Sequence, residues 1–167
     1  GDWSWVRGAF MNGNALFAGS SDGHLYRYTW DGTTFSAPVD LNVRTDWVGS
    51  PAQTFSSIRA MAYDGTGIFF TKTNDPALYW SGFNLESGLV GGFQRVASSS
   101  DWRNVESLVV IGSTLYSTWA AGPNAGRLIA MPLTGITPNQ GAAVALSGPG
   151  IDGRSWSGVE TIAVTGP

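Results

Sequence analysis

The sequence predicts an all-β, β-propeller-like fold with about three four-stranded antiparallel blades plus one strand of a fourth. A motif recurs about every 50 residues, which is a typical length for one propeller blade. Short segments such as LFAGS and LYRYTW alternate large apolar residues with small or polar ones, as β-strands do. Turn-forming stretches such as SSDG, WDG and NDP separate these segments. A plain sandwich or jelly roll also contains many short strands, but it would not repeat in register.

The repeat is anchored on four similar segments, each expected to begin a unit. They read WSWVRGAFM, FSSIRAMAY, WRNVESLVV and WSGVETIAV and span residues 3–11, 55–63, 102–110 and 156–164. Each has a β-branched residue, with an aromatic residue three positions before it and a charged residue one position after it. The four β-branched residues are Val6, Ile58, Val105 and Val159.

Further matches complete each unit. A second segment follows in the first three units (Leu16-Phe17, Ile68-Phe69, Leu115-Tyr116), then a third segment (Leu25-Tyr26, Leu78-Tyr79, Leu128-Ile129), a glycine turn and a weaker fourth segment. The blades are therefore expected at about 3–41, 55–97 and 102–147, with an insertion between the first two and a single strand at 155–167. We expect one propeller-like domain over 1–167, or part of one. Since a propeller ring typically has four or more blades, we expect missing blades of a longer chain, or other copies of the same chain, to close it.

The composition excludes several classes of partner. Charged residues make up 13% of the chain, the net charge is −3, and no Lys/Arg cluster occurs, so nucleic acid is not an expected partner. There is no cysteine for a disulfide or a thiolate metal site. No apolar run is long enough to predict membrane insertion. Low charge and eight tryptophans favour an extracellular or surface-exposed location.

Two repeated positions invite interpretation. The aromatic position, which holds Trp3, Phe55, Trp102 and Trp156, favours packing between adjacent blades over a ring of sugar-stacking platforms. The charged position is expected to face the central channel. Its two cations and two anions form either a structural charge network, the favoured interpretation, or a polar ligand site. These channel-facing residues are Arg7, Arg59, Glu106 and Glu160.

Aromatic residues outside the repeated aromatic position are the better ligand candidates, because that packing does not require them. Trp beside Asp, Asn and Arg is typical of carbohydrate sites, where an aromatic face stacks on the sugar and planar polar groups bind its hydroxyls. Loops on a rigid scaffold commonly carry such sites. The predicted ligand-binding residues are Trp30, Trp47, Trp80, Trp119, Tyr26 and Tyr79.

The sequence does not support an enzyme. Gly19–Gly23 matches G-x-S-x-G, but a strand follows it instead of the helix that a nucleophile elbow requires. His24 is the only histidine and has no carboxylate cluster at metal-ligand spacing. No cofactor fingerprint occurs, so neither a metal nor a cofactor is expected.

The stretches DGHLYRYTWDGTTFSAPVDL and ALYWSGFNLESGLVGGF resemble propeller repeats of actinobacterial secreted proteins and of phage tail-tip proteins. The W-x-x-V and DG-x-LY patterns also resemble blades of tachylectin-type propeller lectins. The resemblance implies the blade architecture. The leading hypothesis, based on the aromatic and polar side chains, is a non-catalytic module that binds a glycan or another cell-surface polymer, on a cell envelope or in the extracellular matrix. Two alternatives stay open: an architectural or protein-interaction propeller in a virion tail or adhesin, and a fragment of a propeller enzyme.

Overall fold

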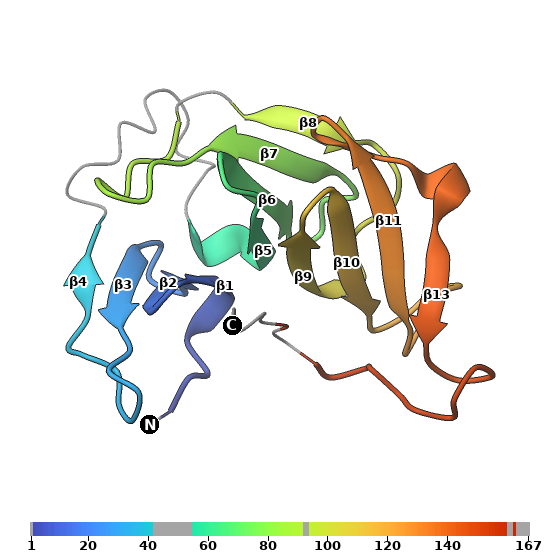
Figure 1. Cartoon of the computed structure of the whole chain (residues 1–167), viewed down its shortest axis with the longest axis horizontal. Coiled ribbons are helices and arrows are strands. Elements are labelled where there is room, and N and C mark those ends of the chain that lie inside the picture. The colour runs from blue at the N-terminus through green and yellow to red at the C-terminus, as the bar shows by residue number, and fades with distance from the viewer. Residues whose placement is uncertain (1, 42–54, 92–93, 160–161, 163–167) are drawn as a thin grey trace.

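A computed structural model describes residues 2–41, 55–91, 94–159 and 162. Its strands form three separate antiparallel sheets, arranged in an arc in Figure 1. This confirms the prediction of an all-β, propeller-like fold. The predicted insertion at 42–54 and most of the predicted strand at 155–167 lie outside the described residues, and residues 155–159 contain no strand.

The first two sheets each contain four strands in chain order. The first sheet consists of β1 (Val6–Asn12), β2 (Ala15–Ser20), β3 (Leu25–Thr29) and β4 (Val39–Asp40). The second follows a 3-10 turn, η2 (Phe55–Ser57), and consists of β5 (Ile58–Tyr63), β6 (Gly67–Lys72), β7 (Leu78–Gly82) and β8 (Arg95–Ser98).

The third sheet divides its outer strand into two pieces. It contains β9 (Val105–Ile111), β10 (Thr114–Trp119), β11 (Leu128–Thr134), β12 (Thr137–Pro138) and, after the turn η3 (Gln140–Ala142), β13 (Val144–Ser147). Strand β12 pairs with the end of β11, and β13 pairs with its beginning. Pro138 has no N–H for the ladder, which is a physical reason for the break at this point.

A glycine turn joins the first and second strands of each sheet. Gly13, Gly65 and Gly112 occupy the same repeat position there, with φ values of 58°, 100° and 58°. Glycine adopts positive φ without a steric penalty, so this position favours a tight hairpin in every unit.

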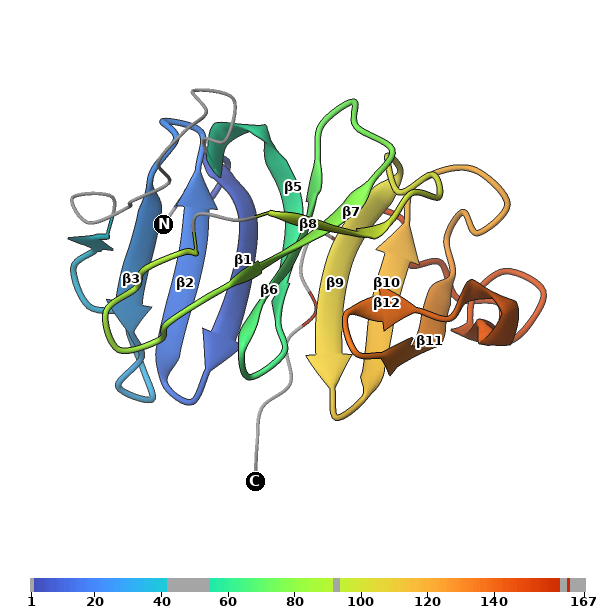
Figure 2. The ribbon, with the colours of Figure 1, turned by 90° about the horizontal axis from the view of Figure 1, so that it is seen from above.

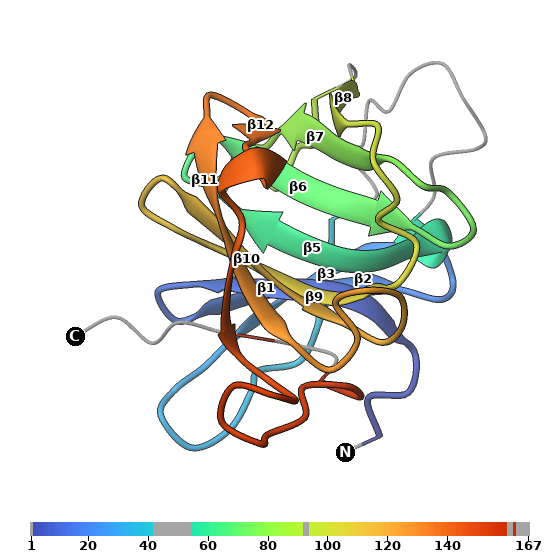
Figure 3. The same ribbon diagram turned by 90° about the vertical axis from the view of Figure 1, so that its right-hand side faces the viewer.

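Two apolar layers hold the three sheets together. Phe10 and Phe17 of the first sheet pack against Met61 and Phe70 of the second. The opposite face of the second sheet, including Phe69, packs on the third through a core that also contains Leu115 and Ile129. The strands of the second and third sheets cross at an angle in Figure 3.

The inner strands β1, β5 and β9 lie side by side in the middle of the arc (Figure 2). Residues at equivalent places on these strands are therefore neighbours in space. In the described part of the chain, no helix is both long and apolar enough to cross a membrane.

Candidate functional site

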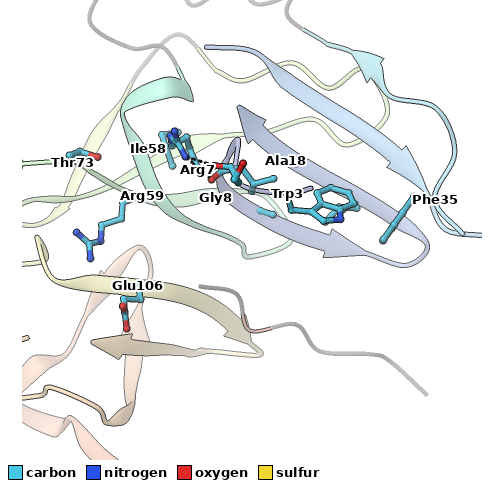
Figure 4. Close-up of a pocket in the computed structure, with 13 residues that line it drawn as sticks. Trp3, Arg7, Gly8, Ala18, Phe35, Ile58, Arg59, Thr73 and Glu106 are labelled. Carbon is cyan, nitrogen blue, oxygen red and sulfur yellow. Dashed lines mark hydrogen bonds between the residues drawn. The ribbon is translucent and has the colours of Figure 1, made fainter. Parts of the chain in front are cut away.

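A pocket of about 590 Å³ lies where the inner strands begin. Figure 4 shows Trp3 and Phe35 at one end of this pocket and Arg59 and Glu106 at the other. The volume is within the range of small-molecule sites, about 300–1,000 Å³. The pocket therefore has an aromatic end on the first sheet and a charged end on the second and third sheets.

Three of the four predicted channel-facing residues line this pocket. Arg7, Arg59 and Glu106 come from β1, β5 and β9, and each directly follows the β-branched residue that begins its strand. The register of the repeat brings them together, because the inner strands are neighbours. The fourth predicted residue, Glu160, lies outside the described residues.

The two arginines of the pocket are not paired with acids. Arg7 Nη1 donates hydrogen bonds to the carbonyl oxygens of Ser4 (3.0 Å) and Val6 (3.2 Å). Among the described residues, no carboxylate oxygen lies within 4.0 Å of either guanidinium group. The expected charge network is thus not formed by direct ion pairs in the described part of the chain. A guanidinium group without a carboxylate partner among the described residues can offer its remaining N–H donors to a ligand at the pocket wall.

Glu106 connects the pocket to the segment that begins the fourth unit. Its Oε2 atom accepts a hydrogen bond from Gly158 N at 2.9 Å. The carboxylate has further acceptor capacity, since each of its oxygens can accept more than one bond. The charged end can therefore offer both donors and acceptors to a ligand.

The repeated aromatic position packs between sheets in the second and third units. Phe55 and Trp102 are 2% and 0% exposed and belong to the two apolar layers. Trp3 holds the same position in the first unit, yet it is 41% exposed. The packing interpretation therefore holds at Phe55 and Trp102.

The predicted ligand-binding aromatics are not brought together, and those that are described do not line the pocket. Trp119 is only 9% exposed; its ring packs on Trp102 with 5.5 Å between centroids, and its Nε1 donates to Ser117 Oγ at 2.9 Å. Trp30 is half-buried, and the centroid of its ring lies 4.7 Å from that of Phe35. Trp47 lies outside the described residues.

Tyr26 and Tyr79 share one structural role. Their hydroxyl groups donate to Asp22 Oδ2 (2.8 Å) and Asp75 Oδ2 (2.7 Å), four residues earlier in each case. The hydrogen bond is the main cause that raises the pKa of Tyr26 to about 12. Burial and then the hydrogen bond raise the pKa of Tyr79 to about 12. These phenols are held by their own turns, although both rings stay partly exposed.

Trp80 is held from several sides. Its Nε1 donates to Asp64 Oδ2 at 2.8 Å, and the Arg95 guanidinium lies 5.7 Å from its ring centroid. The indole lies so close to Gly67 that a side chain there would overlap it. The fixed position suits a binding platform, but the side chain also packs against the core between the second and third sheets.

The pocket also contains two residues that the sequence did not indicate as candidates. Phe35 pairs with Trp30 through an isolated β-bridge, and Thr73 directly follows β6. Neither belongs to the four similar segments, so the repeat offered no signal for them. The structure shows that Thr73 nevertheless holds a repeated place: its N–H donates to the carbonyl of Ser57, and Ala120 N makes the equivalent bond to Asn104 O in the third unit.

In the part of the chain that the structure describes, no group of three His, Asp or Glu side chains is positioned to hold a metal ion. His24 lies instead beside Asp40, with 2.7 Å between Nδ1 and Oδ2.

Comparison with known proteins supports the fold. No protein-family model matches the sequence, and no curated protein matches it either. One chain in a crystal structure of a nidogen/laminin complex matches 87% of this chain at 12% identity with a TM-score of 0.52. The fold of that match is a YWTD β-propeller. The chain spans about half (49%) of the length of that matching chain. A structure of the computationally designed Ika4 protein also matches, at 11% identity with a TM-score of 0.41, over 93% of this chain and 78% of that chain. A structure of human WBSCR16 matches at 12% identity with a TM-score of 0.39, over 83% of this chain and 38% of that chain. The nidogen/laminin match supports a β-propeller-like fold for this chain.

Proposed function

We propose that this chain is a non-catalytic recognition module that binds carbohydrate on a cell envelope or in the extracellular matrix. The observation that carries the proposal is the lining of the pocket, to which each sheet contributes one charged residue: Arg7, Arg59 and Glu106. Both guanidinium groups lack a carboxylate within 4.0 Å among the described residues.

The chemistry of these groups suits a sugar. A guanidinium group presents several N–H donors in one plane, and a carboxylate presents two acceptor oxygens. Neighbouring hydroxyl groups of a pyranose are spaced so that such planar groups can bind two of them at once. An acidic sugar would gain an additional charge-assisted bond to an arginine. Binding of this kind needs no reaction, which agrees with the absence of a catalytic motif in the sequence.

The proposal is tested with a glycan array that includes bacterial cell-envelope polysaccharides, followed by calorimetry on the best ligand. Arg59→Gln is expected to weaken binding roughly 10-fold to 100-fold, because a hydrogen bond to a charged group contributes about 1.5–3 kcal/mol. Arg103→Gln is the matched control. It removes the same charge from an exposed arginine that is paired with Asp101.

Two results would count against the carbohydrate proposal. One is an array on which no glycan binds saturably. The other is an Arg59→Gln variant that binds its ligand as tightly as Arg103→Gln does. Equal affinities would mean that the charged end of the pocket does not contact the ligand.

A protein-interaction or architectural role, as in a virion tail or an adhesin, is the second candidate. The exposed Trp3 favours it, because large aromatic side chains at a surface often mark contact sites between proteins. The resemblance to secreted and phage repeats agrees with either role and with an extracellular or surface-exposed setting.

A further inference from the structure

The contact between successive units includes one hydrogen bond that is repeated three times. In each case the N–H of the repeated aromatic residue donates to a turn carbonyl of the preceding unit. The bonds join Phe55 N to Gly23 O (3.2 Å), Trp102 N to Pro76 O (2.8 Å) and Trp156 N to Gly126 O (3.0 Å). The accepting carbonyl always lies in the turn before the third strand, two residues ahead of Leu25, Leu78 or Leu128.

Trp156 shows that the segment after the third sheet docks in the same way. Its Nε1 also donates to Ser147 Oγ at 2.7 Å, and Val159 O accepts a bond from Thr118 Oγ1 at 3.3 Å. All three sheets therefore use this turn carbonyl to hold the unit that follows them.

Trp3 occupies the same position in the first unit but has no sheet before it in the described residues. Its amide N–H has no hydrogen-bond partner there. Its indole lies against three other rings, at centroid distances of 5.6 Å to Trp5, 5.5 Å to Tyr28 and 5.7 Å to Phe35. We call Trp3, Trp5, Tyr28 and Phe35 the first-sheet aromatic face.

The strand register shows that the same side of the sheet forms a buried interface in the other two units. Positions three and ten residues after the β-branched anchor point toward the preceding sheet. They are Met61 and Ile68 in the second sheet (1% and 0% exposed) and Leu108 and Leu115 in the third (2% and 0%). The same positions in the first sheet, Ala9 and Leu16, are only half-buried, and both line the pocket.

We infer that the first-sheet aromatic face docks a further four-stranded unit of the same repeat, whose turn carbonyl accepts the Trp3 N–H. The interface would continue the two that already join the three sheets. A second copy of this chain does not offer such a site, because Phe55, Trp102 and Trp156 of the same copy already occupy the places beside its three turn carbonyls. Docking would cover the aromatic end of the pocket and leave Arg59 and Glu106 at its charged end.

The test supplies such a unit within the full chain. A copy of residues 102–154 placed directly before Asp2 gives Trp3 the place that Trp156 holds after the native third unit. Hydrogen–deuterium exchange then reports on the Trp3 amide. Exchange is expected to slow by at least about 10-fold relative to a control in which a Gly/Ser chain of the same length precedes Asp2, because a hydrogen-bonded, buried amide exchanges only when its structure opens.

A second extended chain keeps the test decisive if the first one does not fold. It carries residues 55–100 directly before Asp2, which places Trp3 where Trp102 normally stands. Slow exchange of the Trp3 amide in either folded extension supports the inference. Exchange as fast as in the Gly/Ser control, or failure of both extensions to fold where the control folds, overturns it. So does a concentration-dependent dimer of the original chain that disappears in Trp3→Ala, since that result would assign the face to a second copy.

Discussion

Gly67 and Gly82 are cross-strand partners whose replacement by alanine is expected to have opposite effects. They pair directly between β6 and β7. A methyl group on Gly67 would overlap the Ser81 carbonyl oxygen and the Trp80 ring, whereas a methyl group on Gly82 would have open space around it. Neither glycine has the positive φ that disfavours alanine, so the comparison isolates the effect of the added carbon.

The structure sets the size of the expected difference. Overpacking in a closed site costs about 1–3 kcal/mol, and the backbone oxygen of Ser81 cannot rotate away. Displacement of the Trp80 ring also weakens its hydrogen bond to Asp64, so we expect Gly67→Ala to lower the free energy of unfolding by about 2–4 kcal/mol. Gly82→Ala is expected to leave it unchanged or to raise it by about 0.4–1 kcal/mol, because alanine restricts the unfolded chain.

Urea unfolding followed by circular dichroism and by tryptophan fluorescence measures both variants against the original chain. Equal losses in the two variants, or a neutral Gly67→Ala, would refute the close contact between Trp80 and Gly67. The result also bears on Trp80 as a ligand candidate, since the same contact holds its ring in place.

Two further predictions concern single side chains. The pKa of Tyr79 is raised to about 12 by burial and by its bond to Asp75, so the associated stabilisation is complete below the ordinary value of about 10 and is lost as the pH rises from about 10 to about 12. NMR of labelled tyrosine rings should show this pKa fall toward 10 in Asp75→Asn, and an unchanged value would contradict the hydrogen bond. Trp102 is 0% exposed, and its Nε1 has no hydrogen-bond partner among the described residues. In urea unfolding, Trp102→Phe should cost within about 1 kcal/mol, since it also removes an unsatisfied donor. Trp102→Ala should cost about 3–5 kcal/mol, and equal losses in these two variants would contradict the reasoning.

Much of the fold was predictable because its signals are local and repeated. The β-branched anchors Val6, Ile58 and Val105 are the first residues of β1, β5 and β9. Alternation of apolar and polar residues and the glycine turns depend only on neighbours in the sequence. The divided outer strand of the third sheet was not predicted, because its two short pieces carry too few residues for a periodic signal.

The candidate site was predictable only where it follows the repeat. Equivalent positions on adjacent inner strands must be neighbours in space, so Arg7, Arg59 and Glu106 meet at one pocket. Whether they bind a ligand stays a prediction. The aromatic candidates have no such constraint, and sequence alone could not tell that the Trp119 ring packs on Trp102 or that Phe35 closes one end of the pocket.

The sequence by itself determined the repeat unit, its strands and the register that aligns one unit with the next. Only the tertiary structure decided which face of each sheet is covered. The same aromatic position is buried at Trp102 and exposed at Trp3, although the local sequences are alike. The physical reason is that burial depends on a neighbouring sheet contributed by distant residues, and a local pattern specifies a strand without specifying what packs against it.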